Sequence, residues 1–253
     1  MIKVTLLGTG TSVGVPTIGC TCEVCLSTDE RDKRLRASVL VEHNGAQILI
    51  DTSTDFRQQA LRVGLNRLDA VLITHCHADH IFGLDDIRPL NYRQGPIPFY
   101  ANEVAWQAIR DVFGYIFRKG TYKGGGLPQL IPHTIYGPFN LCGLDITPVE
   151  VIHGKLVVLG FRINNFAYVT DTNFIPDESC EKLMELDLLI LDALRYQKHP
   201  THLSLEESLE YIERLKPRRA LLTHINHEIL HERTNKELPE GVELAYDGLQ
   251  IIL

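Results

Sequence analysis

The sequence Thr74-His75-Cys76-His77-Ala78-Asp79-His80, after the apolar run at residues 70–73, places three imidazoles and one carboxylate within six consecutive positions. Imidazole nitrogens and carboxylate oxygens are the donors that zinc, manganese and iron accept, and clustering them in a core without an ion is costly. Because alternate residues of an extended segment point the same way, we expect His75 and His77 to bind one ion. Asp79 and His80 would face a second ion. The alternative is a polar loop whose histidines only form hydrogen bonds. Cys76 should point away and pack as a small hydrophobe.

A second cluster, Cys20, Cys22 and Cys25, occupies a glycine-containing loop near the start of the chain. Three thiolates leave a tetrahedral zinc ion one ligand short, and structural sites of the Cys3His type complete it with an imidazole. We predict His227 as the fourth ligand, which would hold the N-terminal loop against the C-terminal part of the chain. The alternatives are a disulfide or free thiols, although a Cys-x-Cys spacing is awkward to bridge.

The His-x-His-x-Asp-His pattern of residues 75–80 resembles the signature of the metallo-β-lactamase fold hydrolases. In that family a further His, a bridging Asp and a final His follow, each at the end of a strand. The matching positions here are His153, Asp171 and His224, each after an apolar run. The resemblance implies one metal held by His75, His77 and His153 and a second held by Asp79, His80 and His224. Asp171 would bridge them, and water would be the nucleophile.

The Cys loop with His227, the segment Leu7-Gly8-Thr9-Gly10-Thr11-Ser12 and the segment Thr223-His224-Ile225-Asn226-His227 are similar to the PhnP-like phosphodiesterases. This resemblance implies hydrolysis of a small cyclic phosphate, such as a ribosyl or nucleoside cyclic phosphate. It also implies two catalytic divalent ions, zinc or manganese, and one structural zinc. A ribonuclease of the RNase Z type, another ester or thioester hydrolase of the fold, and a noncatalytic metal-dependent sensor remain alternatives.

Three further residues are candidates for roles beside the metals. We assign catalytic roles to Asp79 and to His202, because His202 lies just before a helix start whose N-H groups favour an anion. His199 is the rival for contact with the phosphate. Asp51 follows the apolar run at residues 47–50 and is expected to orient a ligand imidazole or to cap the next helix. Gly8 and Gly10 are interpreted as tight turns.

The order of strand-like and helix-like apolar patterns suits an α/β fold with two sheets packed face to face and helices outside. The resemblance implies that this is an αββα sandwich of two mixed β-sheets, and because no linker interrupts the sequence we expect residues 1–253 to form a single domain. The predicted strands are 2–7, 38–42, 47–50, 70–73, 98–100, 144–152, 157–163, 166–170, 188–191, 220–223 and 249–253. The predicted helices are 54–63, 103–112, 179–186 and 204–215.

The net charge of −7 disfavours nucleic acid as a general partner, because such binding relies on a basic face. The partner that the PhnP-like resemblance implies is a small phosphodiester substrate. No apolar stretch is long enough to span a bilayer and no signal segment is evident, so we expect a cytoplasmic protein without membrane contact. The sequence leaves homodimer formation open. The basic, glycine-rich segment 118–126 is interpreted either as a substrate-gating loop or as a plain surface loop.

Overall fold

The computed structural model describes residues 1–118, 120 and 126–253, so most of the basic segment at 118–126 lies outside the described residues. The described chain forms two seven-stranded sheets. The first has the order β14-β1-β2-β3-β4-β5-β6 and the second the order β13-β12-β11-β10-β9-β8-β7. The strands of the first sheet are β1 (Ile2–Gly8), β2 (Ser38–His43), β3 (Ala46–Ile50), β4 (Ala70–Leu72), β5 (Ile97–Ala101), β6 (Leu130–Thr134) and β14 (Gln250–Ile252).

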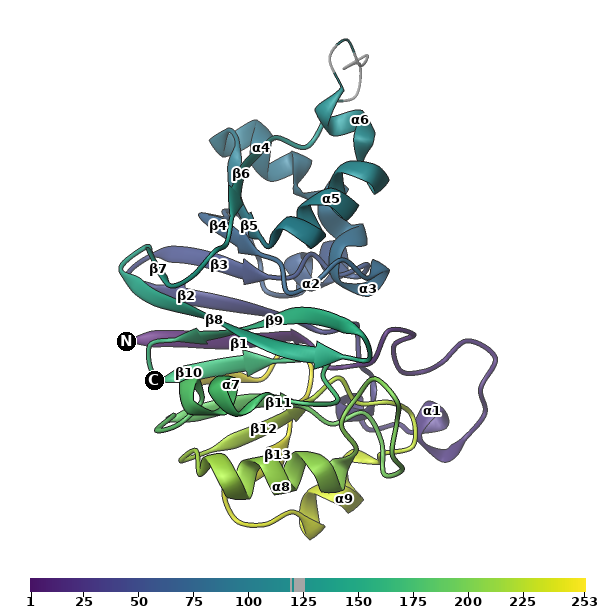
Figure 1. The fold of residues 1–253 in the computed structure, drawn as a ribbon. Coiled ribbons are helices and arrows are strands. Elements are labelled where there is room, and N and C mark those ends of the chain that lie inside the picture. Colours follow the sequence, from purple (N-terminus) through teal and green to yellow (C-terminus); the bar gives the residue numbers. More distant parts are fainter. Residues whose placement is uncertain (119, 121–125) are drawn as a thin grey trace.

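The second sheet repeats the pairing pattern of the first. Counted from β14 in the first sheet and from β7 in the second, three antiparallel pairings are followed by three parallel ones. The strands of the second sheet are β7 (Phe139–Leu141), β8 (Leu144–His153), β9 (Leu156–Ile163), β10 (Phe166–Val169), β11 (Leu188–Asp192), β12 (Ala220–Thr223) and β13 (Val242–Leu244). The last strand, β14, returns to the first sheet beside β1, so both chain ends lie in one layer (Figure 1).

Helices cover the two outer faces of the stacked sheets (Figure 1). The α-helices are α1 (Glu23–Leu26), α2 (Phe56–Arg62), α3 (Ala78–Ile81), α4 (Arg88–Gln94), α5 (Glu103–Val112), α6 (Gly114–Phe117), α7 (Asp177–Lys182), α8 (Leu205–Leu215) and α9 (His231–Glu237). Two short 3-10 helices are η1 (Glu30–Asp32) and η2 (Phe82–Ile87). The helices α4 and α5 lie at the top of the view, and α8 and α9 at the bottom.

Three apolar clusters fill the layers between these elements. The central one joins the inner faces of both sheets, with Val41 and Ile48 from one sheet and Phe161 and Ile190 from the other. The second fills the space between the first sheet and its helices, and the third does the same for the second sheet with α7 and α8. A sheet with two apolar faces needs cover on both sides. The predicted αββα sandwich of two mixed sheets is therefore confirmed.

Most predicted elements are present, but one predicted helix is wrong in its bounds. The helix expected at 179–186 is α7 and ends at Lys182, because the chain leaves helical geometry at Leu183 and Glu185 has a positive φ of 58°. The buried side chains of Leu183 and Leu186 produced the helical spacing, although they belong to a turn. The edge strand β6 was missed because its residues are mostly exposed and include Pro132.

The glycines before the Cys loop do not form the tight turns that were expected. Gly8 ends β1, and a Cβ atom there would lie 2.0 Å from the carbonyl oxygen of Arg36. Gly10 pairs with Arg36 and Ile225, and a Cβ atom there would lie 2.9 Å from Arg34. These positions therefore need glycine because two backbones approach closely.

No helix among the described residues combines the length and apolar character that crossing a bilayer requires.

Candidate metal centre

The carboxyl ends of the parallel strands in both sheets carry the polar residues of the centre. Asp51 follows β3 and the histidine-rich loop follows β4, while Asp171, Asp192 and His224 follow or end β10, β11 and β12. Since the two sheets stack with these ends on the same side, their loops converge. Three of these residues, Asp51, Asp171 and His224, have a positive φ, which costs about 1 kcal/mol or more for a non-glycine residue.

The loop after β4 changes direction at the position that separates its two pairs of donors. His77 is the N-cap of α3, so His75 and His77 precede the helix whereas Asp79 and His80 belong to it. His75, Asp79 and His80 are buried, and His77 is exposed. The first pair is thus extended and the second helical, as the alternation of donors predicted. Cys76 packs with the apolar cluster of the first sheet, as expected.

The seven predicted catalytic ligands gather into two adjacent groups. The donor atoms of His75, His77 and His153 all lie within 4.8 Å of one another. The same holds for a second group made of Asp79, His80, Asp171 and His224. The first group is the set predicted for one ion, and the second group contains the set predicted for the other ion together with Asp171, the predicted bridge.

Asp171 lies where the two groups meet. Its Oδ2 is 3.1 Å from His80 Nε2, and its Oδ1 is 3.3 Å from His224 Nε2. The same Oδ1 is 3.9 Å from His75 Nε2, which belongs to the first group. One carboxylate therefore faces ligands of both groups, which is the placement that a bridging role requires.

The donors fit a pair of divalent cations. Among the described residues, the Nε2 atoms of His75, His80 and His224 are buried and have no hydrogen-bond partner. Buried polar atoms are nearly always satisfied by protein, water or an ion, so three unsatisfied nitrogens aimed at two carboxylates indicate a missing positive charge. Imidazole and carboxylate donors suit zinc or manganese.

The ionisation of these side chains leads to the same conclusion. Burial lowers the pKa of His75 and of His153, which keeps both imidazoles neutral and able to bind a metal. Burial would also lower the pKa of His224, but Asp171 and Asp79 raise it to about 9. Asp171 likewise raises the pKa of His80 despite its burial. Without a metal, the two carboxylates thus draw protons onto the neighbouring rings.

Hydrogen bonds behind the rings fix their orientation. His80 Nδ1 donates to Asp51 Oδ2 at 2.7 Å, and Thr74 donates to the same carboxylate from its backbone N-H and its hydroxyl. His153 Nδ1 donates to the carbonyl oxygen of Thr201 at 2.7 Å. In each ring the Nε2 atom is left to face the centre. The orienting role of Asp51 is thus supported, whereas its role as a helix cap is wrong, because the N-cap of α2 is Asp55.

His202 lies beside the centre, as predicted. Its Nε2 is 4.0 Å from Asp171 Oδ1, and its Nδ1 donates to Asp192 Oδ2 at 2.9 Å. His199, the rival candidate, lies behind His202, with its ring 5.3 Å away and its Nδ1 3.2 Å from the hydroxyl of Thr201. Of the two histidines, His202 is the one that faces the ligand group.

The helix start after His202 does not supply the anion site that the prediction invoked. Ser204 and Glu207 form a capping box at the start of α8, so these N-H groups are satisfied and a carboxylate already lies there. Asp192 instead fixes His202. It is fully buried, ends β11 and also accepts a hydrogen bond from the N-H of Thr172. Sequence reasoning missed Asp192, although it ends an apolar strand just as the family ligands do.

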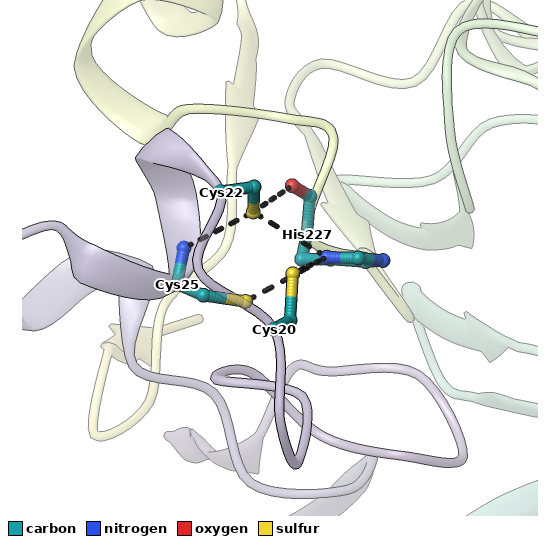
Figure 2. Close-up of side chains that lie close together, drawn as sticks. All are labelled: Cys20, Cys22, Cys25 and His227. Atoms are coloured by element: carbon teal, nitrogen blue, oxygen red, sulfur yellow. Dashed lines mark hydrogen bonds between the residues drawn. The ribbon is translucent and has the colours of Figure 1, made fainter.

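The thiolate cluster is also assembled. His227 Nδ1 lies 3.2 Å, 3.4 Å and 3.6 Å from the sulfur atoms of Cys20, Cys22 and Cys25 (Figure 2). A tetrahedral zinc ion with ordinary bond lengths separates sulfur and nitrogen ligands by about 3.5 Å, so the spacing fits. All six cysteines are free, which excludes the disulfide alternative in this structure. The N-H of Cys25 donates to the Cys22 sulfur and lowers the pKa of that thiol to about 6.

A short segment connects the two clusters. His224 belongs to the first centre and His227 to the second, and Ile225 between them pairs with the N-terminal loop. Its N-H donates to the carbonyl oxygen of Thr9, and its carbonyl oxygen accepts from Thr11. The thiolate cluster thus holds the loop that packs against the final histidine of the catalytic centre.

Comparisons with known proteins agree with this geometry. The family model of a β-lactamase superfamily domain matches residues 46–225. A crystal structure described as a new diphosphatase from the PhnP family superposes with a TM-score of 0.94 at 46% identity, covering 100% of this chain and 98% of that one. Human tRNase Z, short form, has a TM-score of 0.71 at 18% identity and covers 99% and 98% of the two chains, which shows the shared fold alone.

A relative from Porphyromonas gingivalis (strain ATCC BAA-308 / W83), named octanoyltransferase, is 41% identical over 251 residues. The match covers 98% of this chain but 51% of that protein, so the chain spans about half the length of this curated relative. The family model, the overall similarity and the ligand arrangement together place the chain in the β-lactamase superfamily, as a metallo-β-lactamase fold hydrolase of the PhnP-like branch.

Proposed function

We propose that this chain is a metal-dependent phosphodiesterase that hydrolyses a small cyclic phosphate, such as a ribosyl or nucleoside cyclic phosphate. The observation that carries the proposal is the pair of ligand groups that share Asp171, with His202 beside them. A centre of this kind handles two phosphate oxygens and an attacking water together. The similarity to a PhnP-family diphosphatase supports phosphorus as the atom attacked.

The ligand sets follow from the two groups. His75, His77 and His153 would hold one divalent ion, and Asp79, His80 and His224 the other, with Asp171 shared. Cys20, Cys22, Cys25 and His227 would hold a structural zinc. When bound, zinc or manganese would supply a Lewis acid that lowers the pKa of a water ligand toward about 7 and neutralises phosphate oxygens.

The protein side chains move the protons. Asp79 is the proposed acceptor for the proton that the attacking water loses, because its Oδ2 lies inside the second ligand group, 3.2 Å from His80 Nε2 and 3.7 Å from His224 Nε2. His202 would give a proton from Nε2 to the oxygen that leaves phosphorus. Asp192 holds the Nδ1 hydrogen of His202, so the ring keeps Nε2 directed at the centre.

The form of the centre favours a small substrate. Of the seven ligands only His77 is exposed, so a phosphate reaches the buried donors from the side of His77. The segment between Asp171 and His224 folds into α7, β11, α8 and their connections, without the Gly-rich basic arm that would grip RNA. This argues for a small molecule over the RNase Z alternative.

A second candidate is hydrolysis of a diphosphate, because the PhnP-family structure at 46% identity is described as a diphosphatase. The same ligands would serve a phosphoanhydride, whose leaving phosphate depends less on a proton from His202 than an alkoxide does. The acyl ester or thioester alternative draws on the octanoyltransferase, but the match covers only 51% of that protein.

The experiment combines metal content with turnover of matched substrates. Purified protein should contain about three metal equivalents per chain, two in the His/Asp centre and one with the thiolates. It would be assayed on 2′,3′-cyclic nucleotides, ribose cyclic phosphate, a nucleoside diphosphate and p-nitrophenyl octanoate. Turnover of the cyclic phosphates well above the rest supports the proposal. Preference for the diphosphate or the octanoate selects the corresponding alternative, and one metal with no turnover contradicts all three.

The substitution His202→Ala tests the proton transfer. We expect the variant to retain its metals but to lose about 10²- to 10⁴-fold in turnover of a cyclic phosphate with an alkoxide leaving group. Turnover of bis(p-nitrophenyl) phosphate should fall much less, because nitrophenolate leaves without a proton. His199→Ala is the matched control. Equal losses on both substrates would contradict the role of His202 as a proton donor.

The remaining expectations belong to the same proposal. Residues 1–253 would work as one domain in the cytoplasm on a small phosphodiester substrate, without membrane or nucleic-acid partners. The assembly state, monomer or homodimer, would be measured by sedimentation of the metal-loaded protein.

A further inference from the structure

A groove away from the metal centre lies along α8, between this helix and the turn before β13, at the bottom of the view in Figure 1. Its volume is about 750 Å³, and none of the metal-centre ligands lines it. The helix α8 has 11 residues, so it spans about 16 Å at 1.5 Å per residue. The groove is therefore long enough for about three turns of a second helix.

The rim of the groove is acidic, and the neighbouring cation, Lys198, pairs with Glu207 and acts on Glu206 and Glu210 only through space. Glu206, Glu210 and Glu213 lie on one face of α8 at spacings of four and three residues, and Glu240 lies across the groove. All four are exposed, and none forms an ion pair within the part of the chain that the structure describes. Their neighbour Glu207, which lies outside the groove, binds both Lys198 and Ser204. Like charges at this spacing repel each other, so the rim is left in an unfavourable state.

The floor of the groove is apolar. Leu205, Ile212 and Val242 belong to the apolar cluster beneath, and each leaves a small part of its surface open. Leu209 packs against the same cluster and is only partly buried. Tyr196 closes one end and is 43% exposed. An apolar strip bordered by unpaired carboxylates is suited to a ligand that is both apolar and positively charged.

The adjoining sheet edge does not offer backbone donors for an added strand. β13 is the last strand of its sheet, yet the N-H of Val242 donates to the carbonyl oxygen of Pro239 at 3.1 Å. The N-H of Leu244 donates to the side chain of Asn235 at 2.8 Å. Since these amides are already satisfied, an occupant would be held through its side chains.

We propose that this groove docks a basic amphipathic helix of a partner protein. Its apolar side chains at helical spacing would cover Leu209 and the rest of the floor, and its Lys or Arg side chains would pair with Glu206, Glu210, Glu213 and Glu240. Charge complementarity selects this occupant over a second copy of the chain. The chain carries a net charge of −7, and the exposed arginines Arg67 and Arg233 are already paired with its own carboxylates.

The test uses a fluorescein-labelled peptide of 14 residues, with leucine and lysine placed to form one apolar and one basic helix face. Its affinity for the purified protein would be measured by fluorescence anisotropy at low and at physiological salt. We expect binding that weakens with salt and weakens at least about tenfold in Glu206→Gln/Glu210→Gln. The matched control, Glu178→Gln/Glu181→Gln on α7, removes the same charge from exposed residues elsewhere and should bind like the original protein.

A second variant tests the floor without changing charge. Leu209→Ser should also weaken binding of the peptide, and the unfolding midpoint of each variant would verify its fold. Equal losses in the groove and control variants, or equal binding of a peptide with glutamate in place of lysine, would overturn the proposal. Binding of spermine but not of the peptide would assign the groove to a small cation instead. Self-association that disappears in Glu206→Gln/Glu210→Gln would assign it to a second copy.

Discussion

The His/Asp centre and the Cys3His cluster are built in opposite ways, although His224 of the centre and His227 of the cluster lie on the same short segment. The ligands of the centre stand at the ends of four strands, β4, β8, β10 and β12, and on α3, and six of its seven ligands are buried. The ligands of the cluster stand on a loop and on the four-residue helix α1, and only Cys25 of the four is buried. Figure 2 shows the side chains of Cys20, Cys22 and Cys25, from the N-terminal loop and α1, meeting the side chain of His227 from the segment after β12.

The difference shows how the number of donors distinguishes a structural metal site from a site that must also admit a substrate. Four donors at tetrahedral spacing complete the coordination of one zinc ion and leave no position for a substrate. In the proposed centre seven donors would serve two ions with a shared carboxylate, and the exposed side at His77 would leave room for a substrate. The rigid sheet ends are needed where geometry must be held for chemistry, whereas a loop is sufficient where the ion itself completes the structure.

Asp171→Asn should have the largest effect, because it should damage the His/Asp centre and leave the Cys3His cluster intact. It removes the charge that faces His75, His80 and His224 while keeping the size of the side chain. We expect loss of metal from the centre and a fall in turnover on the order of 10³-fold or more. The thiolate cluster should keep its metal, so about one equivalent per chain would remain.

Metal content by mass spectrometry and turnover on the best substrate would be measured on the same samples. Asn226→Ala, within the segment that joins the sites but outside both ligand sets, is the control. A variant that retained both ions of the centre with full turnover would show that Asp171 is not shared between them.

Asp51→Asn should have a smaller effect confined to one ion. Its carboxylate accepts the Nδ1 hydrogen of His80, so the change weakens the orientation of that ring without removing a ligand. Second-layer partners of this kind are typically worth 10- to 100-fold in metal affinity. Titration of the metal-free variant with zinc should show one weakened site of three. Weakening of all three, or an unfolded protein, would mean that Asp51 stabilises the fold rather than one ligand.

Cys25→Ser should act on the other region. It removes the buried thiol of the cluster, and the variant should lose one metal equivalent and about 5 °C in unfolding midpoint, with turnover reduced only a few-fold. Cys180→Ser, a buried thiol away from both sites, is the matched control. A loss of turnover as large as that of Asp171→Asn would show that the loop held by Thr9 and Ile225 governs the centre itself.

The sequence predicted the layers well where apolar patterning was strong. The strands β1, β8 and β12 and the helix α5 were found almost to the residue, because each has a clear apolar run or helical periodicity. The short strand β7, the edge strands β6 and β13 and the helices α4 and α9 were missed. The strand β6 and the two helices are mostly polar or exposed, and β7 and β13 have only three residues each, so tertiary pairing rather than local pattern holds these elements.

The clustering of the seven predicted donors could be foreseen because a dense histidine motif indicated the family and strand ends indicated the other positions. The partners behind them were harder to predict. Asp192 was missed because a lone Asp after a strand is common, and its pairing with His202 joins residues ten positions apart through a loop. The basis for His202 was also wrong, since the capping box of Ser204 and Glu207 satisfies the helix start. Such contacts depend on side-chain geometry that spacing does not encode.

The smallest predicted effect is a loss of stability in acid that arises near the Cys loop and not in the His/Asp centre. Beside the Cys loop, the fully buried guanidinium of Arg34 donates to His231 Nδ1 at 3.2 Å, and the backbone N-H of His231 donates to Asp32. Burial, together with Arg34 and Arg31, lowers the pKa of His231 to about 4. An unfolded histidine has a pKa of about 6.5, so above that value neither state is protonated and the stabilisation is complete. As the pH falls from about 6.5 to about 4, only the unfolded state gains the proton, and stability is lost.

His231→Gln removes this titration, so its free energy of unfolding should fall less steeply than that of the parent protein between pH 6.5 and 4. The measurement is urea unfolding at several pH values in a Cys25→Ser background, where proton competition for the thiolate metal no longer contributes. The control is His43→Gln, because His43 ends β2 and its ring contacts the carbonyl oxygen of Met1 at the surface. Parallel curves for His231→Gln and its parent would place the acid sensitivity elsewhere. A shallower curve would mean that the loop region weakens in acid through one buried contact, independently of the metals of the centre.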